Sequence, residues 1–326
     1  MDAGHIFRWL IYGWTVLVGA VVGSFLNVVI ARVPAGESIV SPRSRCPQCK
    51  AFIRWYDNVP VVSWLVLRAR CRACGSRISA RYPAVEALGA AAALVAVSRH
   101  GLSGAAAAEF AFAAALFALA FIDIDTWLLP NAITWPLIAF GLVMGWLGVT
   151  PAGSALSAAY GAGLGFAAFG LVAWLGEKVF RKEALGFGDV WLLAGLGAFM
   201  GPAGLLPIVL LASIQGATVG LALLALGKGE PGTEAPSRPT DGGRGAPALR
   251  RDGDPATARR DADAVRPGAD VTRARSGLPD ARPEEDDWVP PRHAVPFGPF
   301  LVAGALEWLW FGGLLARAVP VLQLFQ

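Results

Sequence analysis

The longest stretch of this chain without a charged residue runs for 51 residues, from Thr126 to Gly176. A water-soluble domain has no means of burying so long an apolar run, whereas a bilayer accommodates it as two helices of about 20 residues each. A TPAGS segment at 150–154 provides the break between them. Further uncharged runs cover Trp9–Ala31 and Val190–Gly227, and 55% of all residues are hydrophobic. These features indicate a polytopic membrane protein rather than a soluble domain.

We expect an all-α protein with about eight transmembrane helices. Trp9–Ala31 supplies one, the 51-residue run supplies two, and Val190–Gly227, which is broken around a GPAG segment, supplies two more. The other three candidates each carry one acidic residue, and they are Pro83–Ser98, Gly104–Ile122 and Val295–Ala316. The first run is long enough to span a bilayer and lacks a signal cleavage site, so we interpret it as a retained helix.

Basic residues gather in a few connections, and this predicts the orientation, because cytoplasmic loops hold the excess of Lys and Arg. The segment from Arg32 to Arg81 holds nine Arg and one Lys, so it is expected to be cytoplasmic. Alternation of the spans places the 177–188 loop on the same side, and that loop independently carries three basic residues. The same bias explains a pI of about 9.1. It favours membrane lipid, and not nucleic acid, as the partner of the charged loops.

The segment 228–293 differs from the rest of the chain. Residues 228–292 contain 12 basic and 13 acidic residues, many Pro, Gly and Ala, and Trp288 as their one aromatic residue. Such a composition cannot bury a core. We therefore predict a disordered cytoplasmic linker, which acts as a tether before the last helix; a partner-binding role is the alternative.

Acidic residues mark the ends of two predicted spans. Asp123 and Asp125 end one span in AFIDIDTWLLPN at 120–131, and Asp189 begins another in GFGDV at 186–190. The predicted topology puts all three at the cytoplasmic end of the bilayer. Each one taken alone is explained as a helix-end residue that caps backbone groups. Ionisable groups within membranes are nevertheless functional candidates, and two carboxylates that share a site can hold one proton and activate water.

The only four cysteines form two pairs, CPQC at 46–49 and CRAC at 71–74. This spacing is typical of a structural zinc site, in which four thiolates bind one tetrahedral ion. Disulfide bonds are the competing interpretation, and a reducing cytosol disfavours them. Four thiolates leave no open coordination position, so a structural Zn²⁺ is predicted, with the ligands Cys46, Cys49, Cys71 and Cys74.

Taken together, the motifs resemble those of the type IV prepilin peptidases, the bifunctional leader peptidases and N-methyltransferases of type IV pilus and type II secretion systems. The two CxxC pairs carry the resemblance together with GSFLNVVIARVP at 23–34, RYPAVE at 81–86, FIDIDTWLLPN at 121–131, GFGDV at 186–190 and VPFGPF at 295–300. It covers essentially the whole chain apart from 228–293. What it implies is a GxGD-type intramembrane aspartyl protease of the bacterial inner membrane. Such an enzyme cuts the basic leader from prepilins and pseudopilins at the cytoplasmic face.

The resemblance also implies the catalytic residues. The family's first acid lies seven residues before a proline, which corresponds to Asp123 and Pro130 here, and its GxGD aspartate corresponds to Asp189. Asp125 is then a neighbouring polar residue at the helix end. One carboxylate of the pair would take a proton from water and the other would donate one to the scissile carbonyl. The family often has a lysine after GFGDV, where this chain has Trp191.

A second implied activity is methylation of the new N-terminal amine by S-adenosylmethionine. The chain has no glycine-rich nucleotide loop after a strand, so the residues that bind this cofactor stay unassigned. Gly23, Ser24 and Asn27 either belong to this activity or are helix-packing positions. For Glu86, either a loop arginine or no identifiable partner is expected.

The predicted organisation has four parts. Residues 1–81 hold the first helix, the four-cysteine loop and the implied methyltransferase region, and residues 82–227 hold the protease core. The linker 228–293 and the last helix, within 294–326, complete the chain.

Two other classes of protein, a transporter and a membrane scaffold, are alternatives to this prediction. A proton- or cation-coupled transporter would use intramembrane carboxylates, which here are Glu86, Glu109, Asp123, Asp189 and Glu307. Such transporters often contain repeated halves, and the chain has no convincing repeat. A membrane scaffold that displays a zinc module would leave the acids and the GFGD turn without a role.

Overall fold

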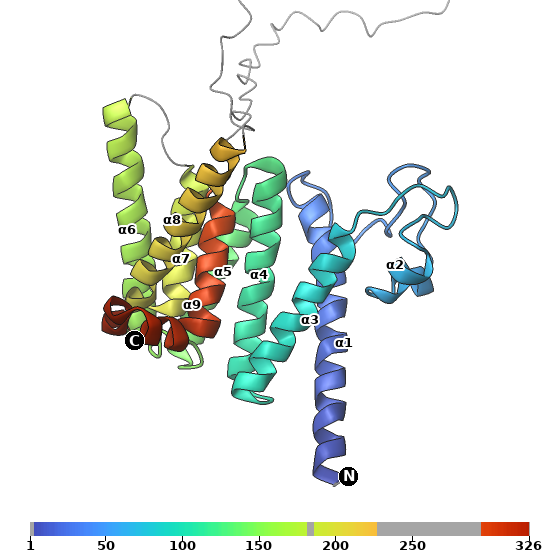
Figure 1. The fold of residues 1–326 in the computed structure, drawn as a ribbon, viewed down its shortest axis with the longest axis horizontal. Coiled ribbons are helices and arrows are strands. Elements are labelled where there is room, and N and C mark those ends of the chain that lie inside the picture. Colours follow the sequence, from blue (N-terminus) through green and yellow to red (C-terminus); the bar gives the residue numbers. More distant parts are fainter. Residues whose placement is uncertain (1–2, 181–185, 227–294, 326) are drawn as a thin grey trace, which may run out of the picture. The chain divides into compact units, whose positions relative to one another are not determined.

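The computed structural model describes residues 3–180, 186–226 and 295–325, and all the regular elements in these ranges are helices. Figure 1 shows the longer ones in chain order: α1 (Ala3–Arg32), α3 (Arg81–His100), α4 (Gly104–Thr126), α5 (Asn131–Trp146), α6 (Ala155–Phe180), α7 (Phe187–Met200), α8 (Pro202–Ala225) and α9 (Gly298–Ala318). The short helix α2 (Val62–Val66) and the 3-10 turn η1 (Trp55–Asn58) lie in the loop between α1 and α3, and the turn η2 (Pro320–Phe325) follows α9.

The predicted all-α architecture and the order of its helices are confirmed in the described part of the chain. Five helices, α1, α4, α6, α8 and α9, are long and apolar enough to cross a bilayer. Helices α5 and α7 are apolar but shorter, with 16 and 14 residues. How many of the helices cross the membrane stays a prediction, as do the four domain boundaries. The predicted linker 228–293 lies outside the described residues.

Glycine allows several helices to pack backbone against backbone. Helices α1 and α3 meet at Gly19, Gly23 and Gly89, where an added Cβ would collide with the facing main chain. Helices α6 and α7 meet in the same way at Gly161 and Gly197. Within a membrane, apolar side chains gain little by leaving lipid, so close backbone approach of this kind is a main source of helix association.

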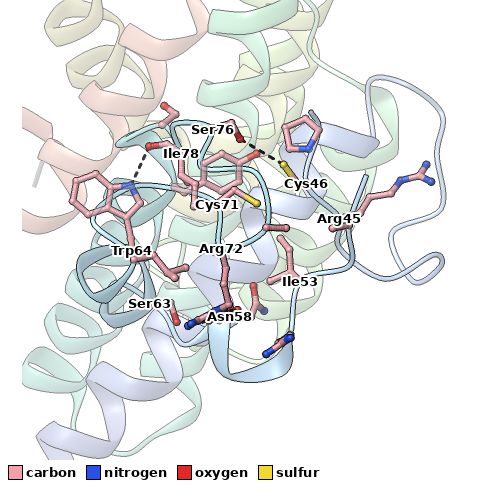
Figure 2. A pocket seen from close by; sticks show the side chains of 18 of the residues that line it. Arg45, Cys46, Ile53, Asn58, Ser63, Trp64, Cys71, Arg72, Ser76 and Ile78 are labelled. Atoms are coloured by element: carbon pink, nitrogen blue, oxygen red, sulfur yellow. Dashed lines mark hydrogen bonds and ion pairs between the residues drawn. The ribbon is translucent and has the colours of Figure 1, made fainter. Parts of the chain in front are cut away.

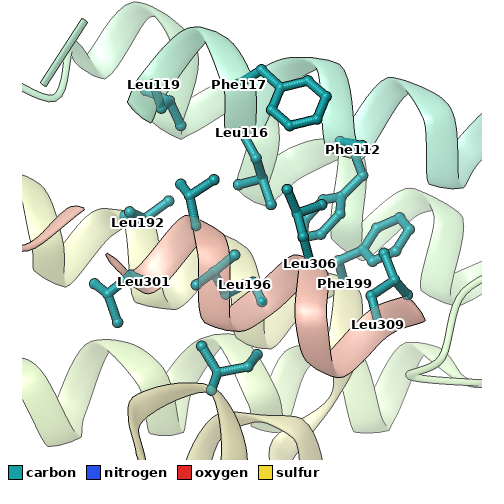
Figure 3. Packing of buried hydrophobic residues seen from close by; sticks show 14 of the residues in the cluster. Phe112, Leu116, Phe117, Leu119, Leu192, Leu196, Phe199, Leu301, Leu306 and Leu309 are labelled. Atoms are coloured by element: carbon teal, nitrogen blue, oxygen red, sulfur yellow. The ribbon is translucent and has the colours of Figure 1, made fainter. Parts of the chain in front are cut away.

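The core between α4, α7 and α9 consists of large apolar side chains (Figure 3). The rings of Phe112 on α4 and Phe199 on α7 stack, with centroids 3.9 Å apart and an interplanar angle of 7°. Leu116 and Leu196 extend this contact along the same two helices, and Leu306 of α9 packs beside them. This packing holds α4, α7 and α9 together, and these helices carry Asp123, Asp189 and Gly298.

A polar cluster fastens α9 to the connection between α3 and α4. Its centre is Glu109, which is only 4% exposed. One carboxylate oxygen lies 2.7 Å from His100 Nε2, and the other accepts a hydrogen bond from Trp310 Nε1 at 3.1 Å. The Arg99 guanidinium lies 3.5 Å from the same carboxylate and donates to the carbonyl oxygen of Leu309. Three helices are thus joined through one buried carboxylate.

Replacement of Glu109 by alanine is expected to destabilise the protein, because it leaves Arg99, His100 and Trp310 without their shared acceptor. We expect a loss of about 3 kcal/mol, visible as a lower Tm in detergent by scanning fluorimetry. The exposed acid Glu177 on α6 provides the matched control, Glu177→Ala. An equal Tm for the two variants would show that the cluster does not stabilise the fold.

Candidate active site

Two carboxylates meet where α4 ends and α7 begins. Asp123 lies in the last turn of α4 and Asp189 in the first turn of α7, and these residues are 4% and 8% exposed. Gly298, the first residue of α9, lies against both. A Cβ at Gly298 would collide with Asp123 Oδ2 and would lie 3.5 Å from Asp189 Oδ1. Two acids distant in sequence therefore face one point in the fold.

The surroundings of this pair set its chemistry. The Gly298 backbone N–H donates to the Asp123 carboxylate, and the Asp123 carboxylate is close enough to interact electrostatically with Asp189. The N-cap of α7 is Gly186, which makes no side-chain capping bond, so Asp189 is not the N-cap. Carboxylates arranged in this way can share a proton, which lets one act as base and the other as acid.

Asp125 is exposed and is bound to Arg81, the first residue of α3. Arg81 Nη1 lies 2.7 and 2.6 Å from the two Asp125 oxygens. The same guanidinium donates to the carbonyl oxygen of Phe121 at 3.3 Å and lies 4.9 Å from the centroid of its ring. The geometry therefore favours Asp123 over Asp125 as the partner of Asp189, and it gives Asp125 a structural contact between α3 and α4.

The glycines of the GFGD turn have different surroundings. A Cβ at Gly188 would lie 2.8 Å from Leu129 Cβ, so glycine allows the start of α7 to approach the α4–α5 connection there. At Gly186 no described atom lies within 4 Å of an added Cβ. Trp191, which stands where the family often has a lysine, packs among aromatic rings, with the Phe166 ring centroid 4.9 Å away.

Gly298 belongs to the VPFGPF motif, to which the sequence alone gives no role. The signal available there is a glycine followed by a proline at the start of a predicted span. That pattern predicts a helix N-terminus. It does not reveal that the glycine lies against two carboxylates from other helices.

The two CxxC turns have the same backbone geometry. In each, the N–H of the first cysteine, Cys46 or Cys71, donates to the carbonyl oxygen five residues later, at 2.9 and 2.8 Å. The residue four positions after that cysteine, Lys50 or Gly75, is left-handed, with φ of 58° and 71°. All four cysteines are free thiols, and their sulfur atoms lie within 4.8 Å of one another.

The thiols are arranged as metal ligands. Backbone N–H groups of Cys49 and Gln48 lower the pKa of Cys46 to about 6. The Ala51 N–H lowers the pKa of Cys49, but burial and the neighbouring thiols outweigh it and raise this pKa to about 11. Four thiols this close cannot all ionise without a cation between them. A divalent ion with tetrahedral sulfur ligands fits the group.

A cavity of about 530 Å³ lies between this loop and the start of α3 (Figure 2). Its volume is in the range of small-molecule sites. Trp64, which donates to the Ile78 carbonyl oxygen at 3.2 Å, and Tyr82 supply aromatic walls. Cys46 and Cys71 also line the cavity, so the four-cysteine cluster shapes one of its sides.

Two carboxylates line the cavity, and one has an arginine as its partner while the other has a backbone N–H. Arg72 makes three hydrogen bonds to Asp57, at 2.6 to 3.1 Å, and holds the pKa of Asp57 below its usual range. Glu86 is 9% exposed, and its Oε2 accepts a hydrogen bond from the Val61 backbone N–H at 2.7 Å. The predicted alternatives for Glu86, a loop arginine or no partner, are both wrong, because its partner is this backbone group.

The GSFLN segment packs behind the cavity. A Cβ at Gly23 would lie 2.6 Å from the Glu86 Cα, so only glycine allows α1 to approach α3 here. Asn27 Nδ2 donates to the carbonyl oxygens of Gly23, at 3.4 Å, and Tyr82, at 3.1 Å. The contacts of Gly23 and Asn27 favour the helix-packing interpretation, and they hold two residues of the cavity wall in place.

This fold and this site define a class: a helical membrane protein with a buried pair of carboxylates at its helix ends and a four-cysteine loop after its first helix. Two family models match the chain. The bacterial peptidase A24 N-terminal domain matches residues 17–100, and the type IV leader peptidase family matches residues 110–221. The chain belongs to the type IV leader peptidase family.

Curated relatives agree with this assignment. The chain is 41% identical to the prepilin leader peptidase/N-methyltransferase of Myxococcus xanthus over 310 residues. The aligned residues cover 93% of this chain and 91% of the relative. It is 42% identical to the type 4 prepilin-like proteins leader peptide-processing enzyme of Escherichia coli, over 61% of this chain and 80% of the relative. The prepilin leader peptidase/N-methyltransferase of Burkholderia pseudomallei is 38% identical, over 64% and 75%. No solved structure matches the chain.

The close contact at Gly298 predicts that Gly298→Ala reduces leader-peptide cleavage. The added methyl group must displace the Asp123 carboxylate, and a displacement of about 1 Å can cost roughly 100-fold in rate. Cleavage in liposomes measures the effect. Gly220→Ala on α8, where an added Cβ meets no described atom within 4 Å, is the control. Equal rates for the two variants would mean that Gly298 does not constrain the carboxylates.

Proposed function

We propose that Asp123 and Asp189 are the catalytic dyad with which this chain cleaves the leader peptides of type IV prepilins and pseudopilins. The observation that carries this proposal is their convergence on Gly298 from two helix ends, buried and with no Lys or Arg paired to either among the described residues. One ionised carboxylate takes a proton from water as the water attacks the scissile carbonyl. The other, protonated, donates to the carbonyl oxygen, and the titration belongs to the pair.

Charge and one contact support an assignment of the side of the membrane on which the site lies. The 32–81 loop carries the Lys and Arg excess that is typical of cytoplasmic loops. The Arg81–Asp125 ion pair joins the end of this loop to the end of α4, two residues after Asp123. We infer an inner-membrane enzyme whose dyad and four-cysteine loop both face the cytoplasm. The basic leader of the substrate would then stay in the cytosol while its apolar segment lies in the bilayer.

We also propose that the four cysteines bind a structural Zn²⁺. Their sulfur atoms lie within 4.8 Å of one another, which is close enough to surround one ion, and the two turns that carry them share one backbone geometry. Four thiolates leave no position for substrate, so the ion would hold the loop together and shape the cavity.

The methylation named in the relatives requires a methyl donor, and we propose that S-adenosylmethionine binds in the cavity beside the four-cysteine loop. When bound, this cofactor supplies a methyl group on a cationic sulfonium. The cavity fits it in volume, and Trp64 and Tyr82 offer aromatic faces to the sulfonium. The lining also contains arginines, which offer donors to the carboxylate of the cofactor, and these are Arg45, Arg54, Arg72 and Arg77.

The dyad is tested by three isosteric variants assayed on a prepilin substrate in liposomes. Asp123→Asn and Asp189→Asn each remove one acid or base, so each is expected to lower cleavage by about 10³-fold or more. Asp125→Asn loses only a partly exposed ion pair, worth about 1 kcal/mol or less, and should stay within a few-fold of wild type. Tm values establish that each variant is folded. Full activity of either dyad variant would exclude that residue from the chemistry.

The metal is tested by measuring zinc per purified chain with mass spectrometry. We expect about one zinc per chain for wild type and for the control Ser98→Ala, and a loss of most of it for Cys46→Ser. Protons compete with the metal for thiolates. Acidification should therefore release zinc, which should be retained at neutral pH. A zinc content that stays the same after Cys46→Ser and after acidification would contradict the proposed site.

A further inference from the structure

The short helix α2 turns a polar side chain inward and its apolar side chains outward. Ser63 is buried, and its hydroxyl accepts one backbone hydrogen bond and donates another, both at 3.0 Å. Val62, Leu65 and Val66 are instead 55%, 61% and 70% exposed. A helix on a water-soluble surface has the opposite arrangement, with its apolar side chains toward the protein. The reversed arrangement indicates an apolar environment on the outer side of α2.

The exposed apolar residues of α2 form one face. Val62, Leu65 and Val66 are spaced i, i+3 and i+4, which places them on the same side of a helix. Ser63 and Trp64 line the cavity on the other side, as Figure 2 shows, whereas none of the three apolar residues lines it. Exposed apolar patches of this kind mark surfaces that contact a membrane or another protein.

The position of α2 favours the membrane. The Val61 N–H, directly before α2, donates to Glu86 Oε2 at 2.7 Å, and a Cβ added at Gly23 of α1 would lie 2.6 Å from the Glu86 Cα. Helix α1 is long and apolar enough to cross a bilayer up to Arg32. Gly23 lies nine residues before that end, or about 13 Å along the helix axis. The loop therefore folds back beside helices that lie within the bilayer.

The charges next to α2 also suit a membrane surface. Arg68 and Arg70 follow the helix directly and are exposed. The ion pairs in the described part of the chain use other arginines. Over residues 32–81 as a whole, ten basic side chains face only Glu37 and Asp57 as acids. Anionic phospholipid attracts such a segment, and an apolar face flanked by arginine is typical of helices that lie in the membrane interface.

We propose that Val62, Leu65 and Val66 form a membrane-contact surface, which inserts into the leaflet on the side of the four-cysteine loop. Its partner is the boundary between headgroups and acyl chains, where Arg68 and Arg70 reach the phosphates of anionic lipids. The loop is thus held against the bilayer by a third point besides the ends of α1 and α3.

The contact has a consequence for the cavity. Ser63 and Trp64 belong to both α2 and the cavity wall, so a fixed α2 keeps the cavity at the membrane surface. Under the proposed function, the substrate keeps its apolar segment in the bilayer, and the N-terminus created by cleavage emerges at this surface. The membrane contact would then keep the loop within reach of that N-terminus.

Lipid photocrosslinking tests the contact in the full chain. Leu65, Val66 or the control Gln48, a polar exposed residue of the first CxxC turn, is replaced by p-benzoylphenylalanine. The proteins are irradiated in liposomes of phosphatidylethanolamine and phosphatidylglycerol, and mass spectrometry measures phospholipid adducts per chain. We expect adducts at positions 65 and 66 to exceed those at position 48 by roughly tenfold, the preference of one buried Leu or Val side chain for an apolar environment. The zinc content of each chain establishes that its loop is folded.

The arginines are tested with the probe at position 66. Replacement of both, as Arg68→Gln with Arg70→Gln, should lower the ratio of phosphatidylglycerol to phosphatidylethanolamine adducts several-fold, because two charges near the surface are lost. Arg43→Gln, at an exposed arginine of the same loop, is the control and should leave the ratio unchanged.

Equal lipid yields at positions 48, 65 and 66 in zinc-loaded chains would overturn the proposal. Adducts at 65 and 66 to the prepilin substrate or to a second copy of the chain, in place of lipid, would also overturn it, since the surface would then be a protein interface. None of these measurements requires cleavage or methylation. A failure of the proposed function is therefore distinguishable from a failure of the membrane contact.

Discussion

Close approach permitted by glycine, to a facing backbone or to a facing side chain, is the constraint on which both sites of this protein depend. At Gly23 it brings α1 against the Glu86 backbone, and at Gly188 it brings the start of α7 against Leu129. At Gly298 it lets α9 begin against the carboxylates themselves. Apolar side chains supply little directional force within lipid, so the positions without side chains decide how closely helices approach. The distances available to catalysis therefore follow from where the chain places glycine.

Helix α9 connects the two ends of the helical core. Its C-terminal half is held by the Glu109 cluster, through Trp310 and the Leu309 carbonyl oxygen, and its first residue meets Asp123 and Asp189. Between these ends the helix packs on α4 and α7 through large apolar side chains. The buried polar cluster thus helps to set the axial position of α9, and with it the contact of Gly298 with the dyad.

The acids that are buried or paired in the described part of the chain fall into two groups, those bound by another side chain and those without such a partner. Glu109, Asp57 and Asp125 are bound by cationic side chains that belong to the fold, and Glu307 accepts a hydrogen bond from Gln215 at 2.8 Å. Asp123, Asp189 and Glu86 are buried without a cationic partner in the described part of the chain. An unpaired buried carboxylate is costly, so its presence in a cleft is a reason to expect chemistry there. The partner of an acid therefore distinguishes structural acids from candidates for chemistry better than its position along a helix does.

Much of this protein could be predicted from its sequence. Uncharged runs of bilayer length determine the helices and their order, since a backbone in lipid must satisfy its hydrogen bonds internally. The CxxC spacing determines the four-thiol group, because each turn is local and closes its own hydrogen bonds. The family motifs identify Asp123 and Asp189 as candidates, but apolar spacing does not separate Asp123 from its neighbour Asp125.

Tertiary structure decided the rest. It turned Asp123 toward Asp189 and Asp125 toward Arg81, gave Gly298 its contact with both members of the pair, and placed Glu86 in a cavity with a backbone donor. The reason is that each of these relations joins helices far apart in the chain. The direction of a side chain around its own helix acquires chemical meaning only when the neighbouring helix, and the atoms it presents, are known.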